Sequence, residues 1–117
     1  MKTLIDLMNF FEGNVKCSKE EVQQWCVVGF HEGTIVCVED EWGNIIGAAT
    51  AYLSGPCTLF ITMIYATSKK AMDHMIFHLQ DRYPGYSMKA KRHGRIVEYN
   101  VEKLKTKILK LWKRNNT

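Results

Sequence analysis

Hydrophobic residues recur at helical spacing in the first part of the chain. Over residues 4–11 they fall every three or four positions, which predicts a first helix that residues 13–14 end. Ser18 and Glu21 then form the pattern of a capping box, in which each side chain bonds the backbone of the other residue. We expect a short second helix to begin there and to stop near Gly29.

The hydrophobic period then changes to that of strands. Residues 34–40 and 44–53 flank a turn at residues 41–43, which predicts a β-hairpin. Residues 86–92 and 95–100 predict a second hairpin in the same way.

Between the hairpins, residues 57–66 predict a third strand that is apolar at both parities. A strand whose two faces are both apolar lies inside a sheet that is covered on each side. We expect one face to carry Leu59, Ile61 and Met63 and the other to carry Phe60 and Ile64.

Two further helices complete the pattern. One runs from about Ser68 to Tyr83, because its apolar residues share one stripe, and the other covers residues 101–114. The order of elements predicts a single domain over residues 1–117, of the α+β or mixed α/β class. Its central sheet should be mostly antiparallel, with helices on both faces.

The composition, with 46% hydrophobic and 24% charged residues, is that of a globular chain. No apolar run is long enough for a transmembrane segment, and the N-terminus lacks the pattern of a signal peptide, so we expect a cytoplasmic location. The four cysteines, which form no C-x-x-C pair, favour free core thiols over disulfides. They are Cys17, Cys26, Cys37 and Cys57.

Charge is distributed unevenly along the chain. Residues 1–81 hold five Lys against ten Asp or Glu, a net of −5, whereas residues 82–117 hold eleven Lys or Arg against two Glu, a net of +9. This basic third can meet phosphates, an acidic protein or a membrane surface, or it can be the solvated face of packed elements. The candidate contacts are Lys89, Lys91, Arg92 and Arg95 on the second hairpin and Lys103, Lys107, Lys110 and Arg114 on the last helix.

The segment from Ile35 to Tyr99 resembles the core of the GNAT acyltransferase superfamily. The stretch VEDEWGNIIGAATAYL is similar to that family's hairpin with an acidic-Gly turn, and a long apolar strand with its crossover helix follows. The compact size and the HGRIVEYN ending also resemble small GNAT-like proteins of tailed phages. The resemblance implies a GNAT-like fold and, for a phage-encoded protein, a place in the host cytoplasm or the virion.

In that family the junction after the long strand carries R/Q-x-x-G-x-G/A, whose backbone amides bind the pyrophosphate of acetyl-CoA. Aligning Ala71 with the last small position puts Lys69 at the glycine and Ala66 at the Arg or Gln, so two of the three anchors are missing. The junction is then either a weaker anion site or an ordinary helix cap with solvated lysines. The residues in question are Thr67, Ser68, Lys69, Lys70 and Ala71.

Direct acyl transfer needs a base for the amine and often an acid for the leaving thiolate. Members of the family commonly use a strand Glu and a Tyr after the last core strands, so the resemblance offers Glu39, Glu98, Tyr65 and Tyr99 as catalytic candidates. None of these matches a catalytic motif, and packing is the favoured role of Tyr65.

His74 and His78 stand four residues apart, with Asp81 after them, which is ligand-like spacing on one helical face. The trio falls opposite the apolar stripe of its helix. We therefore expect a polar face turned to water and no metal site.

Three functions remain open. A retained fold pattern beside a lost glycine loop favours a non-catalytic GNAT-like module that binds a protein partner, as a virion or host-interaction component, without a cofactor. The first alternative is an acetyl-CoA-dependent N-acetyltransferase. The second is a nucleic-acid-binding protein that uses the basic C-terminal third.

Overall fold

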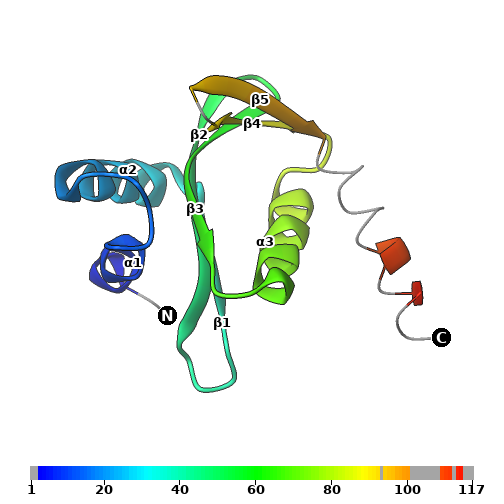
Figure 1. The fold of residues 1–117 in the computed structure, drawn as a ribbon. Coiled ribbons are helices and arrows are strands. Elements are labelled where there is room, and N and C mark those ends of the chain that lie inside the picture. Colours follow the sequence, from blue (N-terminus) through cyan, green and yellow to red (C-terminus); the bar gives the residue numbers. More distant parts are fainter. Residues whose placement is uncertain (1–2, 93, 101–108, 112, 115–117) are drawn as a thin grey trace.

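One five-stranded sheet separates two layers of helices. The computed structural model describes residues 3–92, 94–100, 109–111 and 113–114. Helices α1 and α2 lie on one side of the sheet and α3 on the other (Figure 1). The elements are α1 (Leu4–Phe11), α2 (Lys19–Glu32), β1 (Ile35–Glu39), β2 (Ile45–Gly55), β3 (Thr58–Ala66), α3 (Lys69–Arg82), β4 (Ser87–Arg92) and β5 (Arg95–Asn100).

The sheet follows the order of the sequence, β1-β2-β3-β4-β5. Neighbouring strands are antiparallel except β3 and β4, which are parallel because α3 connects them. The predicted α+β class, the mostly antiparallel sheet and both hairpins are thus confirmed.

Helix α2 begins at the predicted capping box but runs further than the sequence suggests. It ends at Gly33, whose φ of 71° is left-handed, a conformation that glycine adopts readily. Gly29, the predicted end, is buried inside the helix. A Cβ at Gly29 would lie 2.8 Å from Ile35 Cγ1, so this glycine lets α2 approach β1 closely.

Strand β3 contains a bulge at Thr62 that reverses the faces of the residues after it. Thr50 of β2 pairs with Met63 and Ala51 pairs with Ile61, so Thr62 is the extra residue. Its hydroxyl donates to the Thr50 carbonyl at 3.1 Å and lies 2.7 Å from the Thr50 hydroxyl. The prediction that Met63 shares a face with Ile61 is therefore wrong.

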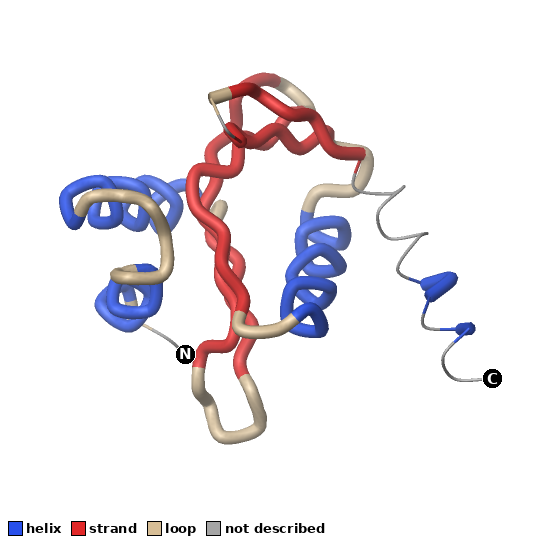
Figure 2. The backbone as a smooth tube through the Cα atoms, viewed as in Figure 1, coloured by secondary structure: helices blue, strands red, loops and turns tan. Residues whose placement is uncertain are grey.

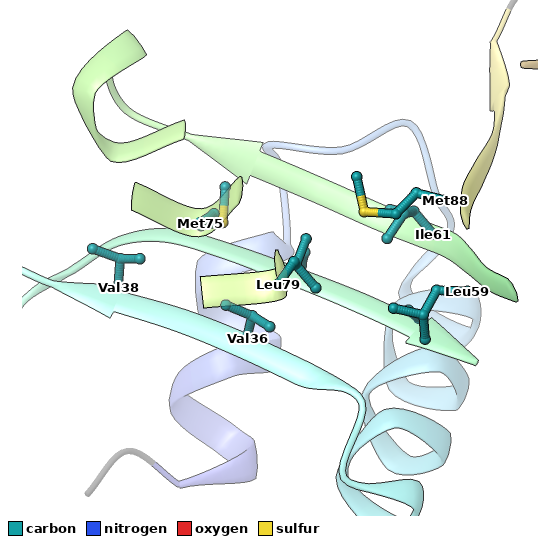
Figure 3. Packing of buried hydrophobic residues seen from close by; sticks show 9 residues of the cluster. Val36, Val38, Leu59, Ile61, Met75, Leu79 and Met88 are labelled. Carbon is teal, nitrogen blue, oxygen red and sulfur yellow. The ribbon is translucent and has the colours of Figure 1, made fainter. Parts of the chain in front are cut away.

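The bulge divides the apolar residues of β3 between two cores. Figure 3 shows the core between the sheet and α3, where Met75 and Leu79 lie over the strands. Its buried members are Val36, Val38, Ala49, Ala51, Leu59, Ile61, Met75, Leu79 and Met88. The core under α1 and α2 consists of Leu7, Phe11, Val22, Cys26, Ala48 and Met63.

Strand β4 follows β3 over a short distance. The parallel register runs from Thr58 with Ser87 to Ile61 with Ala90. Figure 2 shows β4 and β5 turned across the upper end of the molecule, away from the lower half of β3. Residues 62–66 of β3 therefore lie beyond this parallel pairing and lead directly into α3.

The predicted last helix is described in part. Residues 109–111 and 113–114 are helical and lie on the α3 side of the molecule (Figure 1), and the rest of the prediction falls outside the described residues. Within the described ranges, every helix is too short or too polar to cross a membrane.

Candidate functional site

The junction between β3 and α3 is capped by its own side chains. Thr67 donates its backbone N–H and its hydroxyl to the carbonyl of Ile46, at 2.8 and 3.2 Å. Ser68 is the N-cap of α3, and its hydroxyl accepts the N–H of Ala71 at 3.1 Å. The two lysines between Ser68 and Ala71 are exposed, whereas Ala71 is 1% exposed.

These residues do not fit the pyrophosphate of acetyl-CoA in the manner of the GNAT superfamily. Close approach of a phosphate to a helix start needs a bare backbone. Lys69 stands where that family has glycine, and Ala66 stands where it has Arg or Gln. The N–H of Ala71 already donates to Ser68. The exposed ammonium groups of Lys69 and Lys70 can attract an anion here, but the junction does not enclose one.

The candidates for acid and base chemistry do not come together. Glu39 ends β1 and Glu98 lies on β5, the first and last strands of the described sheet. Four interstrand steps of about 4.8 Å place those strands about 19 Å apart. Tyr65 packs on Phe10 of α1, with ring centroids 5.6 Å apart. Tyr99 lies in β5, and its side chain is outside the described part of the structure.

A groove of about 660 Å³ runs beside β1, at the edge of the sheet. Helix α3 lines it with His74, His78 and Arg82, which stand four residues apart along one face. The end of α2 contributes Phe30, whose side chain is 50% exposed. The volume lies in the range of sites that hold a small-molecule ligand.

The lining of this groove combines apolar and charged groups. Ile35 and Val38 of β1 supply apolar surface, and Glu39 with Asp40 supplies acidic groups where the strand ends. Arg82 supplies a cation at the other end of β1. The groove therefore has charged groups at both ends, with apolar residues of β1 and the two histidines of α3 between them.

Arg82 and Tyr83 join the end of α3 to the start of β1. The Arg82 guanidinium donates to the carbonyls of Gly33 and Ile35, at 3.2 and 2.6 Å. The Tyr83 hydroxyl donates to the same Gly33 carbonyl at 3.2 Å. These bonds satisfy the carbonyl of the Gly33 cap of α2 and the Ile35 carbonyl of the edge strand β1, and they hold the end of α3 against both.

The two histidines were expected to face water together with Asp81. His78 and Asp81 are exposed, but His74 is half-buried, and both histidines line the groove. In the ranges that the structure describes, no group of three or more His, Cys, Asp or Glu is placed to hold a metal ion.

Trp42 is exposed on a turn whose backbone is held by Asp40. One carboxylate oxygen of Asp40 accepts the N–H of Trp42 at 3.0 Å and the N–H of Asn44 at 2.8 Å. The Asp40 N–H donates to the Asn44 carbonyl at 2.9 Å, and Gly43 has a left-handed φ of 82°. The indole is 78% exposed, so an ordered turn presents a large aromatic side chain to solvent.

The groove and Trp42 were not predicted as a site. The stretch DEWGN predicts the turn of a hairpin, and nothing in it indicates that Trp42 is exposed. The groove itself has no sequence signal, because it forms where α2, β1 and α3 meet.

The basic candidates are spread over several elements. Lys89 is half-buried on β4, and Lys91 and Arg95 are exposed on the hairpin that β4 forms with β5. Lys110 and Arg114 are exposed in the described residues of the last helix. Arg92 is placed by its backbone alone, and Lys103 and Lys107 lie outside the described residues.

The four cysteines are free thiols. Burial raises the pKa of Cys26 to about 11, and burial together with the nearby Glu21 carboxylate raises the pKa of Cys17. Raised pKa values keep a thiol protonated and unreactive. Cys57 corrects the expectation of core thiols, because it is exposed in the turn between β2 and β3.

Comparison with known proteins gives no family assignment: no protein-family model matches the chain, and a search of curated proteins returns no match.

Proposed function

We propose that the protein is a non-catalytic module that binds a protein partner along β1 and against Trp42. The observation that carries the proposal is the indole of Trp42, 78% exposed on a turn that Asp40 holds. Trp is enriched among the residues that dominate binding energy at protein interfaces. A turn that is already ordered loses little conformational freedom on binding.

The groove beside β1 extends this surface. Glu39 and Asp40 line the groove, and Trp42 lies two residues after Asp40 in the turn. A segment in the groove contacts Phe30 and Arg82, and we propose that it continues past Asp40 to the indole of Trp42. Apolar anchors with a charged rim are the usual composition of a protein interface.

The absence of a fitted phosphate cradle and the separation of Glu39 from Glu98 support a binding role over catalysis. The relationship to GNAT-like proteins of phages stays a prediction from resemblance. It adds the expectation that the partner is a virion or host protein.

Selection of binding peptides tests the proposed surface. Random peptides displayed on yeast are selected for binding to the full chain, and each selected peptide is measured against Trp42→Ala. We expect affinity to fall about 30-fold or more, because removal of a central aromatic anchor costs about 2 kcal/mol or more.

Ile5→Ala is the matched control, since Ile5 is 68% exposed on α1 and should change affinity less than twofold. Selected peptides that bind Trp42→Ala as tightly as the wild type would refute this surface. The circular dichroism spectrum and the thermal midpoint of Trp42→Ala should match those of the wild type, because the exposed Trp42 side chain buries little surface in the folded protein.

The competing function is acetyl-CoA-dependent acyl transfer. The observation that favours it is that residues 62–66 of β3 lie beyond the parallel pairing with β4 and lead into the start of α3. The exposed Lys69 and Lys70 at that start can attract an anion. Acetyl-CoA at about 100 times its Kd would add about 2.7 kcal/mol of stability. We expect no saturable rise of Tm at millimolar acetyl-CoA. A rise that Lys69→Ala/Lys70→Ala abolishes would replace our proposal with the acetyltransferase.

A further inference from the structure

The β4–β5 hairpin has a face that lies on the same side of the sheet as α1 and α2. Met88 points into the core under α3, so its strand neighbours Lys89 and Lys91 point to the opposite side. Cross-strand pairing places Glu98 beside Lys89 and Ile96 beside Lys91 on this same face. Three of these four side chains are exposed, and Lys89 is half-buried.

No helix is packed over this face as closely as over the rest of the sheet in the described structure. Helices α1 and α2 pack on β1, β2 and β3, and Figure 1 shows the hairpin above the level of both. The 67% exposure of Ile96 agrees with this view. The hairpin therefore presents an open sheet surface.

A row of stacked aromatic rings leads to this surface. The rings of Trp25 and Tyr52 lie 5.9 Å apart with an interplanar angle of 13°, and those of Tyr52 and Phe60 lie 5.3 Å apart at 24°. Phe60 pairs across β3 and β4 with Lys89. Across neighbouring strands of one face, Tyr52 on β2 and Phe60 on β3 are therefore followed by Lys89 on β4. We call this surface the ring-lysine face: Tyr52, Phe60, Lys89, Lys91 and Ile96.

We infer that the ring-lysine face binds single-stranded nucleic acid. The ring of Tyr52 is stacked between Trp25 and Phe60, which leaves the other face of Phe60, toward Lys89, for a base. An aromatic ring that stacks a base, with cations beside it for phosphates, is the arrangement that binds single strands without a sequence motif. A sheet face presents both kinds of group to an extended strand at once. Residues 82–100, which include the hairpin, hold five Lys or Arg against one Glu, a net of +4, and this positive charge supplies the long-range attraction.

The face is distinct from the groove beside β1 and does not depend on the protein-binding proposal. A double helix is disfavoured as the ligand, since its bases are already stacked and cannot use Phe60. Glu98 opposes any polyanion because it stands next to Lys89. Removal of the Glu98 charge should therefore strengthen binding. A role of Glu98 in the fold alone would not predict this gain in affinity.

Fluorescence anisotropy with a labelled oligo-dT of about 20 nucleotides tests the inference on the full chain. We expect binding at about 50 mM salt that weakens steeply by about 200 mM. Lys89→Glu/Lys91→Glu should lower affinity at least tenfold, and Glu98→Gln should raise it two- to fivefold. Phe60→Leu, which keeps apolar volume but removes the ring, should lower affinity about fivefold or more.

Lys16→Glu/Lys19→Glu is the matched control, with the same change of charge in the turn before α2 and at its first residue, where both lysines are exposed. It should change affinity less than threefold. The inference is overturned if oligo-dT does not bind at low salt, or if the control pair loses as much affinity as the Lys89/Lys91 pair. Equal competition by dextran sulfate together with an unchanged Phe60→Leu variant would also overturn it, since binding would then be polyanion attraction without stacking.

Discussion

Gly29 shows how a single missing side chain sets the distance between a helix and a strand. It lies inside α2, where glycine costs helix stability of about 1 kcal/mol relative to alanine. In return, glycine allows β1 to pack directly against the Cα of residue 29. An added Cβ would meet Ile35 Cγ1 at 2.8 Å, and that atom is the branch of the side chain rather than its flexible end.

We therefore expect Gly29→Ala to lower the free energy of unfolding, although alanine favours a helix. Overpacking of a tight contact costs about 1 to 3 kcal/mol, which outweighs the gain in propensity. Urea denaturation measures the difference. Ile35→Ala in the same chain should relieve the clash, so the double variant should be more stable than the sum of the single changes indicates. Purely additive effects would contradict the contact.

At the scale of elements, local signals in the sequence predict the fold well. Helix caps, hairpin turns and helix α3 are determined by residues close together in the sequence, and the sequence places each of them to within a few positions. The bulge at Thr62 was not predicted. Alternation along β3 continues through it, and the extra residue is apparent only when β3 is paired with β2.

The bulge should depend on the hydrogen bonds of Thr62. Thr62→Val keeps the shape of the side chain but removes the donor to the Thr50 carbonyl and the partner of the fully buried Thr50 hydroxyl. We expect a loss of about 1 to 3 kcal/mol in the free energy of unfolding. Thr58→Val on the same strand is the control, and it should cost less than about 0.5 kcal/mol. Equal losses at both positions would mean that the hydroxyl pair does not hold the bulge.

At the scale of the whole molecule, the candidate sites are assembled from distant segments. The groove needs Phe30 from α2, β1, and His74 with Arg82 from α3. No spacing within the sequence brings these residues together, which is why the histidines suggested a solvated face. The ring-lysine face was half predicted, because Lys89 and Lys91 were named as contacts while Phe60 was assigned to strand packing alone.

The two proposed surfaces lie at opposite ends of the sheet. In Figure 1 the turn between β1 and β2, which carries Trp42, is at the lower end, and the β4–β5 hairpin is at the upper end. Binding energies of distant sites without shared contacts add to within about 0.5 kcal/mol. We therefore expect a selected groove peptide at saturation to change the affinity for oligo-dT less than threefold, and oligo-dT to change the affinity for the peptide equally little. Anisotropy titrations with each ligand in the presence of the other measure both affinities.

A tenfold change in either affinity would mean that the ligands overlap or that the sheet couples the two sites. Linkage requires this coupling to be the same in both directions. Trp42→Ala then separates the two causes. Overlapping ligands predict that it weakens the binding of both, whereas coupling of separate sites predicts that it removes peptide binding and leaves the affinity for oligo-dT unchanged.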